Sequence, residues 1–223
     1  MTATTAQPPT APVPAPAETF GRRGATDSPA APDRLVREVI DGIRFYYKGY
    51  KNVLEGKKTI HEVMGSSGIQ SLIVTYLTGF LFSNINRRRY WLFTNEVGGH
   101  LETGNNPAFD FAIYDKNVVQ PADINFRYLQ FAPLVAIEVD TDVETEENLS
   151  EQEYIYRKTA NLFQHGTQKV IWVFTRTQQV TVINTLEDWT THPWHTPIEV
   201  LDGISFNLGQ YLDEEGVDVR AAL

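Results

Sequence analysis

Apolar residues recur at helical spacing over residues 69–81. Ser67 precedes this stretch as a suitable N-cap, with Gln70 three residues later. The apolar positions follow the i, i+3, i+4 rule of a helix with one buried face: Ile69, Leu72, Ile73, Tyr76, Leu77, Phe80 and Leu81. The pattern predicts an amphipathic helix that ends near Asn84.

A second helix is predicted from Ser150 to about Gln164. Ser150 and Glu153 form a capping box, and Gly166 provides a C-terminal stop. The predicted buried stripe consists of Ile155, Leu162 and Phe163. Lys158 lies three residues after Ile155 and four before Leu162, so the spacing turns this lysine toward the interior.

Short runs of apolar and β-branched residues predict strands between and after these helices. Thr59–Glu62 reads as a further capping box that opens a short helical turn. Residues 90–101 are expected to form strands or a hairpin, and residues 169–175 and 179–183 a hairpin. The predicted strands are Ile43–Tyr47, Tyr90–Phe93, Val97–Leu101, Asp110–Asp115, Leu134–Asp140, Lys169–Thr175, Gln179–Ile183 and Ile198–Leu201.

Two of these strands carry acidic residues. Strand side chains alternate between faces, so Glu138 shares a face with Ala136 and Asp140, while Val139 lies on the other. An ionised carboxylate at the end of so apolar a strand is unfavourable unless a cation or hydrogen bonds compensate it. The inward-facing Lys158 is a suitable partner. One alternative is that the two form a structural ion pair with no chemical role.

The length and composition indicate one globular domain with additional terminal segments. The chain has 223 residues, of which 42% are hydrophobic. Residues 1–34 are rich in alanine and proline and are expected to be a disordered tail, either a tether or a dispensable segment. Residues 35–212 are expected to form the domain, and residues 213–223 an acidic C-terminal end.

Charge and cysteine usage restrict the chemistry. The chain has no cysteine, so any metal must be bound by oxygen or histidine. A net charge of −9 disfavours a protein that coats DNA without specificity, although a nuclease with a local basic path remains compatible with it. No apolar run approaches the ~20 residues of a membrane span, and the start of the chain lacks a signal-peptide pattern. We therefore expect a soluble, cytoplasmic protein without a membrane partner.

The order of these residues resembles the Uma-two family, which belongs to the PD-(D/E)XK restriction-endonuclease-like superfamily. Asp110 is followed by Glu138 after an apolar run, by Lys158 eight residues before Gly166, and by the strand Val170–Val173. The segments Asn95–Gly98 and Ile137–Thr141 strengthen the resemblance, which covers about residues 40–208. It implies an α/β fold with a restriction-endonuclease-like mixed β-sheet flanked by helices.

The resemblance also implies a function. It suggests an endonuclease that hydrolyses phosphodiester bonds in DNA with Mg²⁺ or Mn²⁺. Asp110, Glu138 and the Val139 carbonyl would bind the cation, and Asp110, Glu138 and Lys158 would be catalytic. Two departures stand out: Asp140 occupies the position two residues after Glu138 where the motif has lysine, and Pro107 lies three residues before Asp110. In the resembling family the lysine commonly comes from the following helix, which Lys158 matches.

Other acidic and histidine residues remain open candidates. Glu62 could complete the metal site or simply cap its own turn. Asp140 could add a metal ligand or belong to a solvated acidic loop. Glu96 could support the site from outside the metal ligands or lie in solvent, and His100 could be a ligand or a surface residue.

Basic and aromatic residues also allow two interpretations. Arg87–Arg89 could contact phosphates or complement the helix dipole, and Arg127 in the long connection 116–132 could reach a substrate phosphate. Residues 188–197 are expected to form a loop that could stack a base or cover an edge of the core: Trp189, His192, Trp194 and His195.

Two alternatives to a nuclease follow from the same residues. One is a catalytically silent nuclease-fold module for binding or scaffolding, which the acidic balance and Asp140 favour. The other is a metal hydrolase acting on a small phosphorylated substrate. A homodimer would suit an enzyme that cuts both strands, although no residue requires it.

Overall fold

The computed structural model describes residues 32–140, 143–145 and 149–219. Most of the predicted tail, residues 1–31, lies outside this range, as do residues 220–223 of the predicted acidic end. Residues Asp33–Leu35 form a 3-10 turn, η1, in which Leu35 is buried. The described part of the chain therefore begins before the predicted domain boundary.

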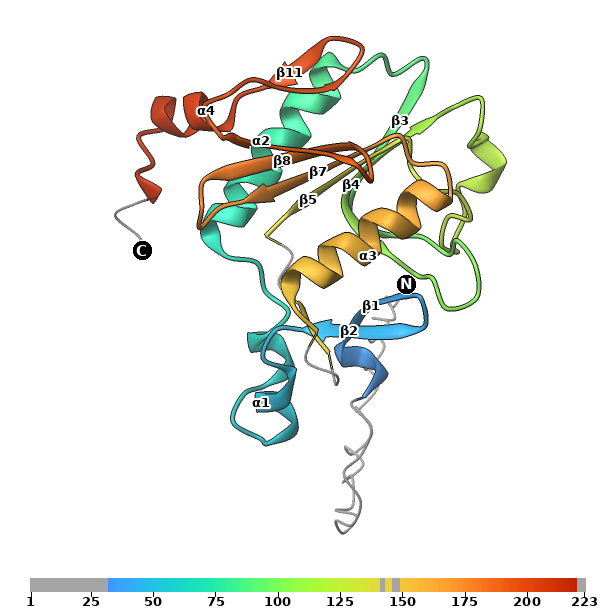
Figure 1. Ribbon diagram of the computed structural model, residues 1–223, viewed down its shortest axis with the longest axis vertical. Helices are drawn as coiled ribbons and strands as arrows, with labels where there is room; N and C mark the ends of the chain where they lie inside the picture. The colour runs from blue at the N-terminus through green and yellow to red at the C-terminus, as the bar shows by residue number, and fades with distance from the viewer. Residues whose placement is uncertain (1–31, 141–142, 146–148, 220–223) are drawn as a thin grey trace, which may run out of the picture. The chain divides into compact units, whose positions relative to one another are not determined.

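A six-stranded mixed sheet forms the centre of the fold (Figure 1). Its strands, in spatial order, are β3 (Tyr90–Gly98), β4 (Ala108–Asp115), β5 (Val135–Val139), β7 (Lys169–Phe174), β8 (Gln179–Thr185) and β9 (Asp188–Pro193). All neighbours are antiparallel except β5 and β7, which are parallel. A parallel pair needs a crossover connection, and here the crossover contains a helix. The predicted hairpin of β7 and β8 is confirmed.

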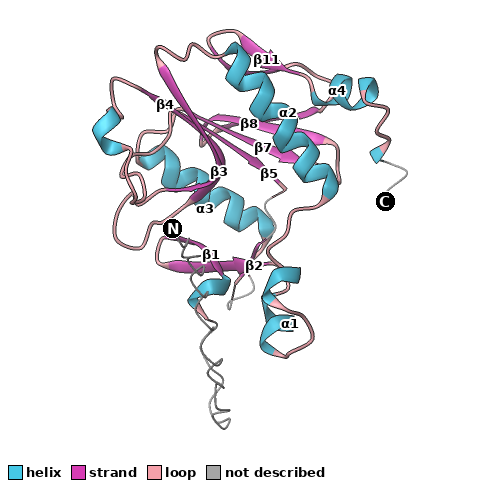
Figure 2. Ribbon diagram, turned by 180° about the vertical axis from the view of Figure 1, so that it is seen from behind, coloured by secondary structure: helices cyan, strands magenta, loops and turns pink. Residues whose placement is uncertain are grey.

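The two predicted long helices cover opposite faces of this sheet (Figures 1 and 2). Helix α2 (Gly68–Asn84) packs Ile73, Leu77 and Leu81 on one face. Helix α3 (Glu151–Gln164) packs Tyr154, Ile155 and Leu162 on the other. Their N-caps are as predicted, because Ser67 accepts a hydrogen bond from the Gln70 amide and Ser150 from the Glu153 amide. The predicted mixed sheet flanked by helices is thus confirmed.

A second, smaller sheet lies against the outer side of α3 (Figure 1). It contains β1 (Val36–Ile40), β2 (Ile43–Tyr47) and β6 (Val143–Glu144). β1 and β2 are joined by a two-residue turn in which both residues have positive φ, Asp41 at 52° and Gly42 at 75°, as a tight hairpin turn requires. β2 has the predicted bounds, whereas β1 was not predicted.

Shorter elements complete the described chain. They are α1 (Tyr50–Leu54), η2 (Ile60–Glu62), η3 (Pro121–Asp123), β10 (Ile198–Leu201), β11 (Ile204–Phe206) and α4 (Leu208–Glu214). Helix α4 extends beyond Leu212, and Val219 is buried in the core beside α2. Part of the predicted acidic end is therefore packed on the domain.

Two sequence predictions about local structure need correction. Residues 90–101 were expected to form strands or a hairpin; residues 90–98 are strand, as expected, but they form one bulged strand and no hairpin, since β3 pairs with β4 on both sides of an irregularity between Thr94 and Val97. The predicted loop 188–197 contains the edge strand β9, whose residues are mostly exposed. An exposed edge strand lacks the alternating burial that reveals a strand in sequence.

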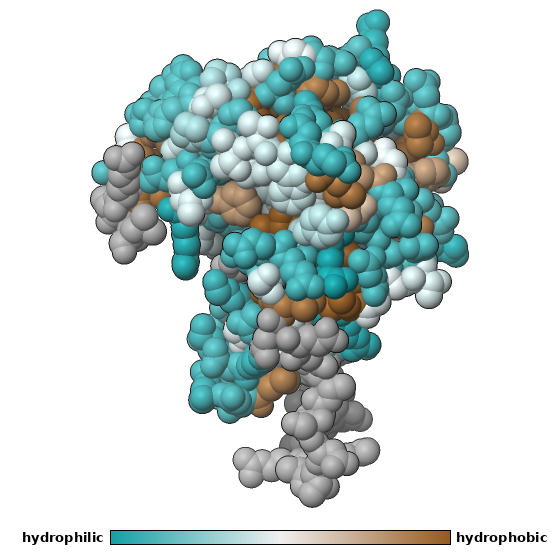
Figure 3. All heavy atoms as spheres, in the orientation of Figure 1, coloured by the Kyte–Doolittle hydropathy of each residue, from teal (hydrophilic) through white to brown (hydrophobic). Residues whose placement is uncertain are grey.

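Apolar side chains are concentrated inside these layers. On the face seen in Figure 3 most surface residues are hydrophilic, with small separated hydrophobic patches. Of the helices in the described ranges, none is both long and apolar enough to cross a membrane.

Candidate active site

The ends of β4 and β5 bring two acidic residues together. Phe111 pairs with Ile137 in the antiparallel register, and the next step places Asp110 opposite Glu138. Both side chains are buried, Glu138 completely and Asp110 to 7% exposure. Asp110 Oδ2 accepts a hydrogen bond of 2.8 Å from the Val139 amide, which fixes this carboxylate across the strand pair.

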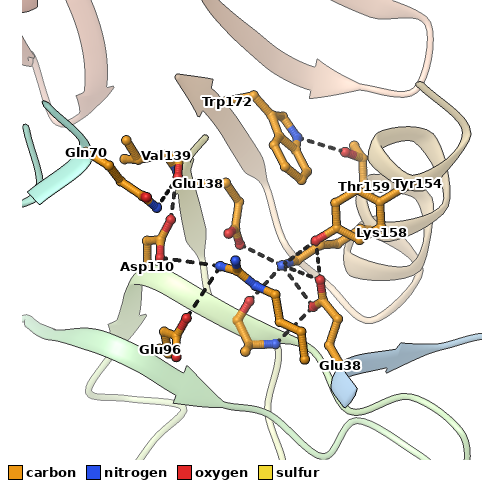
Figure 4. Close-up of polar contacts among 12 residues, drawn as sticks. Glu38, Gln70, Glu96, Asp110, Glu138, Val139, Tyr154, Lys158, Thr159 and Trp172 are labelled. Carbon is orange, nitrogen blue, oxygen red and sulfur yellow. Dashed lines mark hydrogen bonds and ion pairs between the residues drawn. The ribbon is translucent and has the colours of Figure 1, made fainter. Parts of the chain in front are cut away.

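Lys158 reaches this strand end from α3 (Figure 4). Its Nζ lies 2.9 Å from Glu138 Oε1 and 2.9 Å from Glu38 Oε2, and it donates a 2.7 Å hydrogen bond to the Ala108 carbonyl. The side chain is fully buried. The helical spacing therefore predicted the inward direction of Lys158 correctly, and the structure adds a second carboxylate as its partner.

Burial and charge shift the two pKa values in the same direction. Desolvation raises the pKa of Glu138 to about 8, even though the positive charge of Lys158 acts to lower it. Desolvation also acts to lower the pKa of Lys158, but the Glu138 and Glu38 carboxylates outweigh it and raise the pKa. Lys158 is consequently protonated near neutral pH, so it is a hydrogen-bond donor and a positive charge rather than a base.

Glu38 and Tyr154 belong to the same buried network but were not predicted. The Tyr154 hydroxyl donates a short hydrogen bond to Glu38 Oε1, and the Ala108 amide donates one of 3.1 Å to Glu38 Oε2. Tyr154 and Lys158 lie four residues apart and therefore share one face of α3. The four-residue spacing from Lys158 could have indicated Tyr154 from the sequence. Glu38 lies 120 residues from Lys158, so no such spacing could have indicated it.

Two β-bulges direct Arg37 and Glu96 to the site. The β1–β2 register shifts between Val36 and Glu38, and the β3–β4 register shifts between Thr94 and Val97. Glu96 has a positive φ of 53° within its bulge. A bulge inserts an extra residue and redirects a side chain, so Arg37 points to the same region as its neighbour Glu38.

Arg37 supplies a second positive charge beside the acids. Its Nη2 lies 3.8 Å from Asp110 Oδ1 and 3.6 Å from Glu96 Oε1, and its side chain is 9% exposed. Burial acts to lower the pKa of this guanidinium. Nearby negative charges, including Glu38 and Asp110, outweigh burial, so the pKa is raised above its ordinary value. The sequence prediction left Glu96 open; the structure places it near Arg37 at the rim, with a half-exposed side chain.

The predicted metal ligands provide oxygen atoms at adjoining strand ends. The Val139 carbonyl accepts a 2.8 Å hydrogen bond from Gln70 Nε2 of α2, and a carbonyl oxygen has a second lone pair. Within the described ranges no three histidine, cysteine, aspartate or glutamate side chains form a metal cluster by themselves. Two carboxylates and a carbonyl nevertheless suit a hard cation that keeps several water ligands, as Mg²⁺ does. The donor set therefore fits the implied cation.

Several residues that the sequence left open as metal-site candidates form other interactions. Glu62 is exposed and accepts a 2.7 Å hydrogen bond from the Thr59 amide, so it caps its own turn as the sequence allowed. Asp140 leaves the strand with a positive φ of 47° and accepts a 2.7 Å hydrogen bond from the Thr175 amide. The structure therefore connects Asp140 to the end of β7. The Nδ1 atom of His100 lies 2.5 Å from Asn106 Oδ1.

Several of the basic and aromatic candidates are also engaged elsewhere. Arg89 forms an ion pair of 3.3 Å with Asp115 at the far end of β4. Trp194 is buried in the core, and His195 Nε2 lies 3.2 Å from Asp213. Trp189 is 37% exposed and stacks against Tyr156 of α3. Of the two interpretations of residues 188–197, stacking a base or covering an edge of the core, Trp194 follows the second.

Comparison with known proteins adds a likeness in backbone. No protein-family model matches the sequence, and no curated protein matches it either. Among solved structures, the chain is similar to one from Anabaena variabilis described as a "putative nuclease belonging to DUF820". The identity is 15% and the TM-score is 0.48, with 65% of this chain and 78% of that chain covered. These values relate the two backbones in outline only.

Proposed function

We propose that the chain is a metal-dependent endonuclease that hydrolyses phosphodiester bonds in nucleic acid, with DNA as the first substrate to test. The observation that carries the proposal is the meeting of Asp110, Glu138 and Lys158 at one strand end, in the order that resembles the Uma-two family. Arg37 supplies a guanidinium beside them, a group suited to binding phosphate oxygens.

In this proposal Asp110, Glu138 and the Val139 carbonyl would hold Mg²⁺ or Mn²⁺. A bound divalent cation supplies a water of lowered pKa and polarises the phosphoryl oxygens. Hydrolysis consumes one water molecule: its oxygen bonds to phosphorus, one P–O ester bond breaks, and the leaving alkoxide takes a proton. No thiolate is available as a ligand, because the sequence has no cysteine.

The residues of the chain have separable roles. Lys158 stays protonated, so it orients Glu138 at 2.9 Å and contributes positive charge near the reacting phosphoryl group. Arg37 is held by Glu96 and Asp110 and can exchange part of these contacts for phosphate oxygens. The Val139 amide fixes Asp110 through Oδ2. The other oxygen, Oδ1, lies 3.8 Å from Arg37 Nη2 and is the one that would bind the cation.

The test compares cleavage of end-labelled single-stranded and duplex DNA with Mn²⁺, with Mg²⁺ and with chelator. Asp110→Asn and Glu138→Gln keep the shape of each side chain and replace a proposed carboxylate ligand by a neutral amide, so both should remain folded by circular dichroism and lose cleavage by at least about 100-fold. The matched control is Glu187→Gln, an exposed carboxylate in the loop before β9, which should cleave as wild type does.

Binding of Mn²⁺, measured by electron paramagnetic resonance, provides a second test of the proposed metal site. It should weaken in Asp110→Asn and stay unchanged in Glu187→Gln. Cleavage that persists in chelator, or folded Asp110→Asn and Glu138→Gln proteins that cut at the wild-type rate, would contradict the proposed site.

A second candidate is the catalytically silent binding module. The observation that favours it is the saturation of Lys158, whose ammonium already has Glu38, Glu138 and the Ala108 carbonyl as partners. An ammonium has three N–H donors, so these contacts use them all. In that case wild type binds nucleic acid with or without Mn²⁺ and leaves it intact.

A further inference from the structure

A cavity opens beside the candidate active site. It has a volume of about 210 Å³, and its lining includes Arg37 and Ala108 of the site together with Arg34, Tyr47, Met64 and Tyr128. Pockets for drug-sized ligands are larger, at ~300–1,000 Å³. This cavity therefore has room for one ring system and too little for a base-paired duplex.

Tyr128 forms an aromatic wall that is both exposed and fixed in place. Tyr128 is 63% exposed, yet the next residue, Leu129, is bound to the end of β3 and the segment after it: the Leu129 amide donates to the Gly98 carbonyl at 3.1 Å, and the His100 amide donates to the Leu129 carbonyl at 2.7 Å. The ring rests on Gly98, where a Cβ atom would come within 2.7 Å of it. Such a ring offers a stacking face without much further loss of conformational freedom.

The other walls provide a second ring and positive charge. Tyr47 of β2 is half-buried, and the Arg37 guanidinium lies 5.9 Å from its ring centroid. Arg34 is exposed at the same cavity. In a chain of net charge −9, arginines beside aromatic rings are a local exception that suits a phosphate backbone with an unstacked base. Glu96 also lines the cavity and is paired with Arg37.

We propose that this cavity receives one unpaired base of a single-stranded nucleic acid, stacked on Tyr128, while Arg34 and Arg37 face the flanking phosphates. The proposal rests on the proposed function and specifies the substrate of the same site. A base inside a duplex is covered on both faces by its neighbours, so only an unpaired or extruded base can enter such a cavity. Single-stranded substrate is therefore preferred to duplex.

The experiment measures binding and cleavage separately. Fluorescence anisotropy in chelator, which prevents metal-dependent cleavage, compares a labelled single-stranded oligonucleotide with the duplex of the same sequence. Wild type should bind the single strand more tightly. Tyr128→Ala should weaken this binding by about 5- to 150-fold, the loss expected for one base stacked on an aromatic ring, and Tyr128→Phe should restore it because stacking needs the ring and not the hydroxyl.

The chain offers a matched control two residues away. Phe126 is fully exposed in the same connection and does not line the cavity, so Phe126→Ala should bind as wild type does. Equal losses in Tyr128→Ala and Phe126→Ala, or a wild-type preference for duplex, would overturn the proposal.

Cleavage of the same two oligonucleotides with Mn²⁺ separates this proposal from the function on which it rests. Cleavage that depends on Asp110 but shows no preference for single strands and no effect of Tyr128→Ala would leave the nuclease in place and reject the base cavity. Tyr128-dependent binding of the single strand without any cleavage would reject the nuclease and support the cavity as a binding site. Absence of both binding and cleavage would reject both.

Discussion

Replacement of Glu138 by glutamine should change how the stability of the protein depends on pH. Glu138 is fully buried, and desolvation raises its pKa from 4.5 to about 8. A group whose pKa is higher in the folded state contributes stability that is fully present below the unfolded pKa and is lost as pH rises through the folded pKa. The free energy of unfolding of wild type should therefore fall between about pH 4.5 and pH 8.

The expected size follows from the shift. One pKa unit corresponds to about 1.36 kcal/mol, so the shift from 4.5 to about 8 corresponds to roughly 5 kcal/mol across this window. The glutamine in Glu138→Gln has the shape of the protonated acid and cannot ionise, so the stability of this variant lacks this dependence on pH. Lys158 does not add to it, because its pKa is raised and it titrates above the window.

The assay is urea unfolding of wild type and Glu138→Gln at constant ionic strength and several pH values from 5 to 8, in chelator. The two free energies should be similar near pH 5 and diverge as pH rises, with the variant more stable. Glu187→Gln should follow wild type at every pH. If the difference in the free energy of unfolding between wild type and Glu138→Gln stays constant over this pH range, the reasoning is refuted. A constant difference would mean that Glu138 is ionised to the same extent in the folded and unfolded states.

Three further predictions concern packing and are measured by the same unfolding assay at one pH. Gly79→Ala in α2 should raise the free energy of unfolding by about 1 kcal/mol, since a Cβ there meets no atom within 4 Å and alanine favours the helix; a loss of stability would show that α2 is not helical there. Gly209→Ala in α4 should lower it by ~1–3 kcal/mol, because the added Cβ would lie 2.4 Å from the His195 ring, and a neutral result would contradict this close approach. Leu77→Ala should cost about 2–5 kcal/mol, because Leu77 is fully buried between α2 and the sheet; a cost below about 1 kcal/mol would be inconsistent with that packing.

Periodicity in the sequence determined the main helices and most of the central strands. The stripe on α2 and the inward direction of Lys158 follow from helical spacing, which is a local property of the chain. The position of Glu138 on an apolar strand showed in the same way that a positive partner was needed. These predictions succeeded because each depends on residues within one element.

The rest of the site depended on tertiary structure. Glu38 and Lys158 are 120 residues apart, and no local pattern indicates that they meet. Arg37 and Glu96 reach the site through β-bulges, which shift the register that sequence alternation assumes. The exposed edge strand β9 likewise gave no burial pattern to detect. The sequence by itself thus determined which faces of each element are apolar, whereas the pairing of strands and the packing of α3 decided which charges are brought together, because burial makes each of those charges depend on its distant partners.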